Sequence, residues 1–111
     1  MSKALIEKIL RAREQAVTVG ERTFTIRRPT SADMVEMEGK NNLDYLRKFV
    51  VGWNLQELDV VPGGGAEPIP YDAEVWAHYL NDRQELWAPL GEAIIKSITD
   101  YAEARKVDGK N

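Results

Sequence analysis

The segment from Leu86 to Tyr101 is the part of the chain that most restricts how it can fold. Its apolar residues recur every three or four positions, so they share one face of a helix roughly four turns long. Such a stripe must pack against other elements to be hidden from water. A helical core is therefore expected around this segment. The stripe consists of Leu86, Trp87, Leu90, Ile94, Ile98 and Tyr101, with Ile95 beside it.

Helical spacing extends over three regions of the chain. Residues 2–14 are expected to form a first, partly basic helix. Residues 31–55 are expected to be helical and to begin at a capping signal, in which Thr30 is followed three residues later by Asp33. Residues 72–107 are expected to be the closing helical region, which contains the long apolar stripe.

Two other segments follow different rules. Residues 16–28 alternate apolar and polar side chains around Gly20-Glu21, which predicts a β-hairpin with a tight turn. A lone hairpin is marginal in water, so its apolar face must pack on helices or on the strands of another subunit. Residues 56–70 are rich in glycine and proline and are expected to be a loop. Loops of this length are usually functional or disordered.

The fold class that follows is mainly α, or α+β by strict count. About five helices and one N-terminal β-hairpin are expected in a single domain over residues 1–111. The chain is 43% hydrophobic and 30% charged, as is typical of a soluble globular protein. It has no cysteine, which excludes disulfides and thiolate metal sites and is compatible with a reducing cytoplasm.

Charge is unevenly distributed along the chain. Residues 1–28 hold seven Lys and Arg against three Asp and Glu, whereas residues 29–111 hold eight against fifteen. A molecule with a basic end and an acidic remainder can associate head to tail or with a charged partner. A homo-oligomer is therefore expected. No secretion signal and no apolar run long enough to cross a bilayer is visible, so no membrane association is expected.

Residues able to carry chemistry are sparse. His78 is the only histidine and has no nucleophile or orienting acid beside it in the sequence. Gly63-Gly64-Gly65 lacks the Lys-Ser/Thr ending of a phosphate-binding loop. No cluster of carboxylates and histidine has metal-ligand spacing. The chain is therefore expected not to be an enzyme and to need no cofactor or metal.

A basic hairpin is the one feature that favours nucleic acid. Arg22, Arg27 and Arg28 together with Phe24 would suit a contact with a phosphate backbone and bases. The acidic remainder and an isoelectric point near 5.2 oppose it. Nucleic acid is therefore not expected as a partner.

Large apolar residues outside an obvious chemical motif are the candidates for partner or subunit contacts. Tryptophan is enriched at binding hot spots but also fills small cores, so both roles stay open for the three tryptophans. The candidates are Phe24, Ile26, Trp53, Val60, Val61, Ile69, Tyr71, Trp76 and Trp87.

Three motifs occur in a fixed order. Phe24 to Thr30 reads FTIRRPT, Val50 to Leu55 reads VVGWNL and Glu67 to Asp72 reads EPIPYD. With the closing helical region from Trp76 to Ile98, this order resembles the tail assembly chaperones of long-tailed bacteriophages and prophages. The resemblance covers Phe24 to about Lys96, and Asp72 stands where a serine cap is more usual.

The resemblance implies a binding protein of tail morphogenesis. Such proteins bind the long, helical tape-measure protein, keep its apolar surface soluble and help recruit tail-tube subunits. The chain would then work in the cytoplasm of the bacterial host and be absent from the mature virion. Helix-in-groove contact is the expected mode of binding. Two alternatives stay open: a neck or tail-completion component retained in the virion, and a small nucleic-acid-binding regulator.

The C-terminus offers a further parallel with this family. Its members are often made in two forms, and the longer form arises by ribosomal frameshift near the end of the short one. Gly109-Lys110-Asn111 can be encoded by a slippery, adenine-rich heptamer. The gene sequence decides whether that heptamer is present and whether a shifted reading frame continues beyond it.

Overall fold

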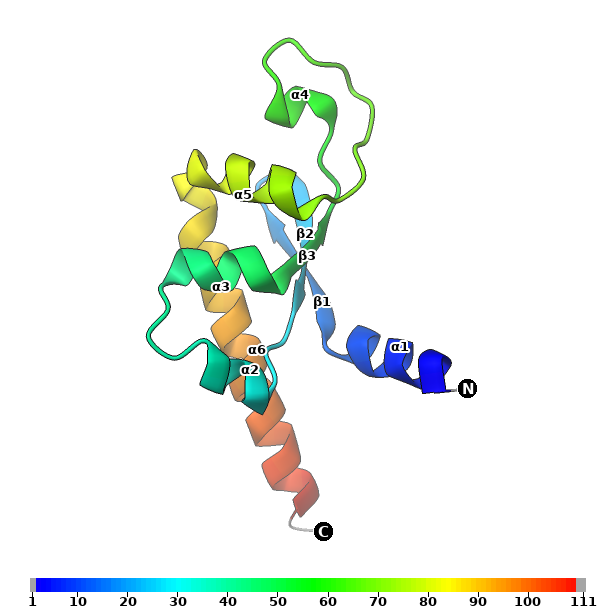
Figure 1. Cartoon of the computed structure of the whole chain (residues 1–111), viewed down its shortest axis with the longest axis vertical. Coiled ribbons are helices and arrows are strands. Elements are labelled where there is room, and N and C mark those ends of the chain that lie inside the picture. The colour runs from blue at the N-terminus through cyan, green and yellow to red at the C-terminus, as the bar shows by residue number, and fades with distance from the viewer. Residues whose placement is uncertain (1, 110–111) are drawn as a thin grey trace.

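The structure is a computed structural model that describes residues 2–109. This part of the chain contains six α-helices, one 3₁₀ turn and three β-strands (Figure 1). In chain order the elements are α1 (Ser2–Ala12), β1 (Glu14–Val19), β2 (Arg22–Arg27), α2 (Ser31–Glu36), α3 (Asn42–Phe49), β3 (Val50–Trp53), α4 (Glu57–Val60), α5 (Ala73–Asn81), η1 (Gln84–Leu86) and α6 (Trp87–Gly109).

The fold is a mixed α+β arrangement with more helix than strand, in agreement with the predicted class. The predicted count of elements is corrected, because residues 2–109 contain six α-helices where about five were expected. The sheet has three antiparallel strands in the order β1-β2-β3, where only a hairpin was expected.

β1 and β2 form the predicted hairpin, but over residues 14–27 rather than 16–28. Val19 pairs with Arg22, which leaves Gly20 and Glu21 as a two-residue turn. Gly20 has a φ of 63°. Glycine takes this left-handed conformation without steric cost, which suits the tight turns of antiparallel hairpins.

The helix predicted to reach Leu55 instead ends at Phe49, and Val50–Trp53 form the third strand. The apolar residues here do recur at helical spacing. However, two consecutive β-branched valines followed by Gly52 are weak helix formers. The open edge of β2 offers backbone donors and acceptors to an extended chain, so strand pairing replaces the last turns of helix.

Polar caps determine where three of the helices begin. The Thr30 hydroxyl accepts a hydrogen bond from the Asp33 N–H at 3.0 Å, and the Asp33 carboxylate accepts one from the Thr30 N–H at 2.8 Å. Asn41 and Asp44 make the same reciprocal pair at the start of α3. Asp72 accepts two backbone N–H groups at the start of α5. The Thr30 and Asp72 caps were predicted from the sequence.

The loop predicted over residues 56–70 is internally ordered. It contains the helical turn α4, and its two arms are hydrogen-bonded to each other. The Leu58 N–H donates to the Gly65 carbonyl at 2.9 Å, and the Ile69 N–H donates to the Leu55 carbonyl at 3.0 Å. Glycine and proline dominate this segment of the sequence, so neither the helical turn nor the hydrogen bonding between the arms could be predicted from it.

The core lies between the sheet and α3, α5 and α6. α6 packs against β1, β2 and α3, and Figure 1 shows α3 and α5 crossing near its N-terminal half. The long apolar stripe of the sequence supplies the α6 side of this core. The buried apolar residues are Phe24, Ile26, Met37, Leu46, Phe49, Val50, Leu55, Trp76, Leu80, Leu86, Leu90 and Ile94.

Two predicted helical boundaries are corrected. The first helix ends at Ala12 rather than at residue 14, because the strand β1 already begins at Glu14. The closing region predicted over residues 72–107 is divided between α5, η1 and α6, and the backbone of α6 is helical to Gly109. Lys110 and Asn111, which belong to the suggested frameshift sequence, lie outside the described residues.

Candidate partner-binding grooves

Three of the predicted contact residues lie inside the core of the chain itself. Phe24, Ile26 and Trp76 have no exposed surface. The Trp76 ring lies 5.6 Å from the Phe24 ring, and its indole N–H donates to the Leu46 carbonyl at 2.9 Å. These side chains join β2, α3 and α5, so they are not available to a partner in this fold.

Trp53, Ile69 and Tyr71 are partly buried and fasten the end of the loop to β3. The Trp53 indole N–H donates to the Ile69 carbonyl at 2.8 Å, and the Tyr71 hydroxyl donates to the Val50 carbonyl at 2.7 Å. The Trp53 and Tyr71 rings meet edge-on, 4.7 Å apart. Burial raises the pKa of the Tyr71 phenol, and the charge of Asp72 adds to the rise. The polar atoms of this cluster are thus used within the chain.

Trp87 is partly buried at the joint between α5 and α6. Its indole N–H donates to the Leu80 carbonyl at 2.8 Å. Carbonyl groups in the last turn of a helix have no partner within the helix. The Leu80 carbonyl therefore accepts from outside α5, from the Trp87 indole and from the Arg83 N–H at 3.2 Å. Trp87 therefore helps to set the angle between the two helices.

Val60 and Val61 are the predicted contacts that the structure leaves at an open site. They line a groove of about 430 Å³ between α4 and α5, which we call the loop groove. Val61 is 51% exposed, and Val75 of α5, which the sequence did not single out, is 38% exposed. The residues that line the loop groove are Val60, Val61, Val75, His78, Tyr79, Asp82 and Arg83.

The α4 wall of the loop groove is held by a set of partly buried polar contacts. Arg22 of β2 forms an ion pair with Asp59, with Nε and Oδ2 2.8 Å apart, and donates to Gln56 Oε1 at 3.2 Å. Arg83 donates to the Asp59 carbonyl at 3.1 Å. A wall fixed before binding loses less conformational entropy when a partner arrives.

The rim of the loop groove is polar. His78, Asp82 and Arg83 lie on or just after α5, and the Arg83 guanidinium is 5.0 Å from the centre of the Tyr79 ring. Valine side chains bordered by a polar rim can pack against the apolar face of an amphipathic helix, while the rim contacts the polar residues at the edges of that face.

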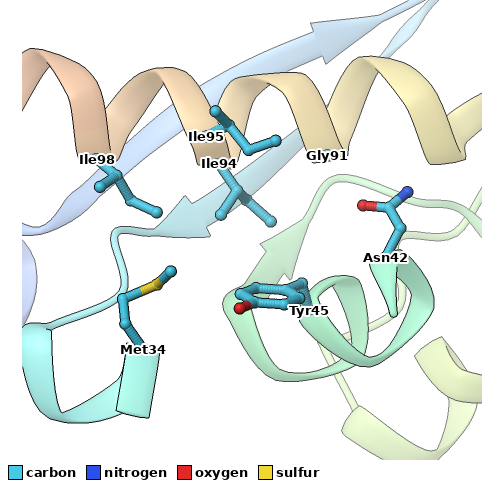
Figure 2. A pocket seen from close by; sticks show the side chains of 7 residues that line it. All are labelled: Met34, Asn42, Tyr45, Gly91, Ile94, Ile95 and Ile98. Atoms are coloured by element: carbon cyan, nitrogen blue, oxygen red, sulfur yellow. The ribbon is translucent and has the colours of Figure 1, made fainter. Parts of the chain in front are cut away.

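A second groove, which the sequence did not indicate, lies where α2, α3 and α6 meet (Figure 2). It has a volume of about 370 Å³ and a mostly apolar lining, and we call it the helix groove. Ile95 is 64% exposed although it lies beside the buried stripe of α6. That extra isoleucine is the sequence feature that points to this surface. The lining residues are Met34, Asn42, Tyr45, Gly91, Ile94, Ile95 and Ile98.

α1 presents an apolar face that the rest of the described chain leaves uncovered. None of its residues is buried, and Leu5, Ile6 and Ile9 are 60%, 53% and 54% exposed. Figure 1 shows α1 projecting from the sheet on the side away from α2 and α3. These apolar residues recur at helical spacing in the sequence, yet none of them is among the contact residues expected from it.

A tight joint fixes the direction of α1. Arg13 alone connects it to β1; the Arg13 carbonyl accepts from the Arg28 N–H at 2.7 Å, and Arg13 Nε donates to the Arg28 carbonyl at 2.9 Å. The Arg13 guanidinium also forms an ion pair with Asp33 at 3.3 Å. Burial lowers the pKa of Arg13, and the Asp33 carboxylate opposes this shift. Burial acts to raise the pKa of Asp33, but hydrogen bonds from Thr30 and the charges of Lys48 and Arg13 outweigh it, so that this pKa is lowered.

Other kinds of site have little support in residues 2–109. No three side chains of the metal-binding types in this range are grouped closely enough to hold a metal ion. None of the helices described is both long and apolar enough to cross a bilayer. Comparisons with protein-family profiles, with curated proteins and with solved structures find no match to this chain.

Proposed function

We propose that this chain is a tail assembly chaperone of a long-tailed bacteriophage or prophage. It binds the tape-measure protein, keeps that protein soluble and helps recruit tail-tube subunits. It has no enzymatic activity, acts in the cytoplasm of the bacterial host and is left out of the mature virion. The open loop groove, in which exposed valines lie beside a wall held by hydrogen bonds and an ion pair, is the observation that supports a binding role most directly.

The loop groove suits a helical partner. Val61 and Val75 expose apolar surface from α4 and α5, and the polar rim lies beside them. A tape-measure helix has an apolar face that aggregates when it is exposed before assembly, and such a face can be covered in a groove of this kind. Asp82 and Arg83 provide charges of both signs for the flanks of the bound helix.

The motifs that carry the family resemblance contribute to the frame of the loop groove. Trp53 belongs to the Gly-Trp motif, and Ile69 and Tyr71 belong to the Pro-x-Pro motif that ends the loop. Their hydrogen bonds join the two motifs and hold the loop that carries Val60 and Val61. In the proposed role, the two motifs therefore hold in place the loop that contacts the partner.

Co-expression with the tape-measure protein of the same phage tests the proposal. The tape-measure protein is expected to be soluble with the natural chain and to precipitate with a Val61→Asp/Val75→Asp variant, because buried carboxylates oppose apolar docking. Val35→Asp is the matched control, since Val35 is 74% exposed and lines neither groove. A tape-measure protein that is equally soluble with and without this chain refutes the proposal.

Mass spectrometry of purified virions separates the chaperone from a structural component. The chaperone is expected to be missing from the particle. Recovery of this chain in a fixed ratio to the tail proteins would instead favour a neck or tail-completion protein, for which solubility of the tape-measure protein is irrelevant.

A further inference from the structure

We propose that α1 of one copy of this chain docks in the helix groove of a second copy. The two surfaces are both exposed and apolar, and they belong to the same molecule, so each copy supplies a knob and a receptor. The inference does not depend on the proposed role in tail assembly.

The two surfaces match in length. Leu5, Ile6 and Ile9 lie within about one and a half turns of α1, whereas the α6 side of the helix groove runs from Gly91 to Ile98, about two turns. In Figure 2, Ile94 and Ile98 point from α6 toward Met34 and Tyr45, and Ile95 lies beside them on the outer side of the helix. An apolar helix face of this length can pack against such a row of isoleucines by ridges-into-grooves contact.

α1 cannot reach the helix groove of its own chain in this fold. The joint is one residue long, and the backbone and side chain of Arg13 are bonded to Arg28 and Asp33. α1 therefore stays on the side of the sheet away from α2 and α3 (Figure 1). The helix that fills the groove must come from another molecule.

Charge favours α1 over a neutral or acidic helix as the occupant. α1 carries Lys3, Lys8 and Arg11 against the single acid Glu7. The segments that border the helix groove carry the exposed acids Glu38, just after α2, and Glu92, next to Gly91. They also carry two exposed lysines, Lys40 and Lys96, of which Lys96 is paired with Asp100. Neither Glu38 nor Glu92 forms an ion pair within residues 2–109. Opposite charges around an apolar contact set its orientation and speed its formation.

The overall shape is less compact than expected for a chain of this length, which is consistent with an element that packs on another molecule. The radius of gyration is 15.6 Å, compared with about 13 Å for a compact chain of this length. The excess reflects elements that project from the core, and α1 is one of them.

Sedimentation equilibrium on paired variants tests the docking. The natural chain is expected to self-associate, and both Ile6→Asp/Ile9→Asp and Ile95→Asp are expected to sediment as monomers of 12.6 kDa. An equimolar mixture of these two variants is expected to form a dimer, because one intact α1 and one intact helix groove remain. Leu58→Asp is the control for an exposed apolar residue elsewhere and should associate like the natural chain.

Cysteine cross-linking provides a second measurement. The chain has no cysteine, so a copy with Ile6→Cys mixed with a copy with Ile95→Cys should form a mixed disulfide dimer. Leu58→Cys in place of Ile6→Cys should not. A natural chain that stays monomeric, or a variant mixture that stays monomeric while circular dichroism shows both variants folded, overturns the proposal. A monomeric chain whose Ile95→Asp variant no longer solubilises the tape-measure protein would assign the groove to that partner instead.

Discussion

At the scale of single residues, Trp76 and Trp87 make the same kind of hydrogen bond but are buried to different extents, so they are expected to contribute differently to stability. Both indole N–H groups donate to a backbone carbonyl, at 2.9 Å to Leu46 and at 2.8 Å to Leu80. Trp76 is fully buried, whereas Trp87 keeps part of its surface in water. The sequence placed both on apolar helical stripes and could not separate them.

Replacing each tryptophan by phenylalanine measures this difference. Trp87→Phe loses one hydrogen bond and should lower the free energy of unfolding by about 1 kcal/mol. Trp76→Phe loses a hydrogen bond and also leaves a cavity, so about 2 kcal/mol or more is expected. Urea unfolding followed by circular dichroism measures both. Equal losses would mean that the burial of Trp76 does not matter.

Asp33 is predicted to make stability depend on pH. Its pKa is lower in the folded chain, so its contribution is present above its unfolded pKa of about 4 and is lost as the pH falls through the folded value. Asp33→Asn is therefore expected to lower the free energy of unfolding by about 1 kcal/mol at pH 7. The difference from the natural chain should shrink below pH of about 4.

A carboxylate on the surface provides the control for Asp33. Asp100 pairs with Lys96 at 2.7 Å, but its side chain is 60% exposed. Asp100→Asn should therefore change the free energy of unfolding by less than about 0.5 kcal/mol at any pH. Urea unfolding over a pH series compares the two variants, and a pH-independent deficit in Asp33→Asn would contradict the ionic explanation.

At the scale of elements, the contact between α3 and α6 depends on a missing side chain. Gly91 is buried in α6, and a Cβ at this position would overlap Asn42 Oδ1 and lie 3.1 Å from Asn42 Cγ. The Asn42 amide donates to the Trp87 carbonyl at 3.0 Å in the first turn of α6. Glycine weakens the helix locally but allows α3 to approach.

A double-mutant cycle tests this contact. Alanine stabilises a helix interior by about 1 kcal/mol relative to glycine, but in the natural chain Gly91→Ala should be destabilising because Asn42 must move and lose its bond. In an Asn42→Ala background the same change should be stabilising. Urea unfolding gives the four free energies, and the same sign in both backgrounds would rule out the explanation.

Among the elements, features set by local chemistry could be predicted from the sequence, whereas strand pairing between distant segments could not. The Thr30–Asp33 and Asp72 caps and the Gly20 turn act within a few residues, so the sequence predicted them. β3 depends on the edge of β2, whose paired residues lie 24 to 29 positions earlier in the chain, so the sequence around β3 does not reveal the pairing. The helical periodicity before Trp53 was real but was overridden.

At the scale of the whole molecule, α1 is predicted to be dispensable for the fold. It has no buried residue and projects from the sheet. Removal of residues 1–11 should therefore change the free energy of unfolding by less than about 1 kcal/mol, measured at a concentration where the chain is monomeric. Leu90→Ala, at a fully buried position of α6, is the contrasting variant, with a loss of about 2–5 kcal/mol. A comparable loss in the shortened chain would show that α1 belongs to the core.

The sequence by itself determined the helical core, the hairpin and the absence of recognisable catalytic motifs, because periodicity, caps and residue types act over short stretches. Tertiary structure alone decided which apolar residues are covered. Of the nine predicted contact residues, the fold placed Phe24, Ile26 and Trp76 in its core and left Val60 and Val61 at the loop groove. It also left α1 and the helix groove open. Exposure is a property of all the elements that pack around a side chain, and these elements come from distant parts of the chain.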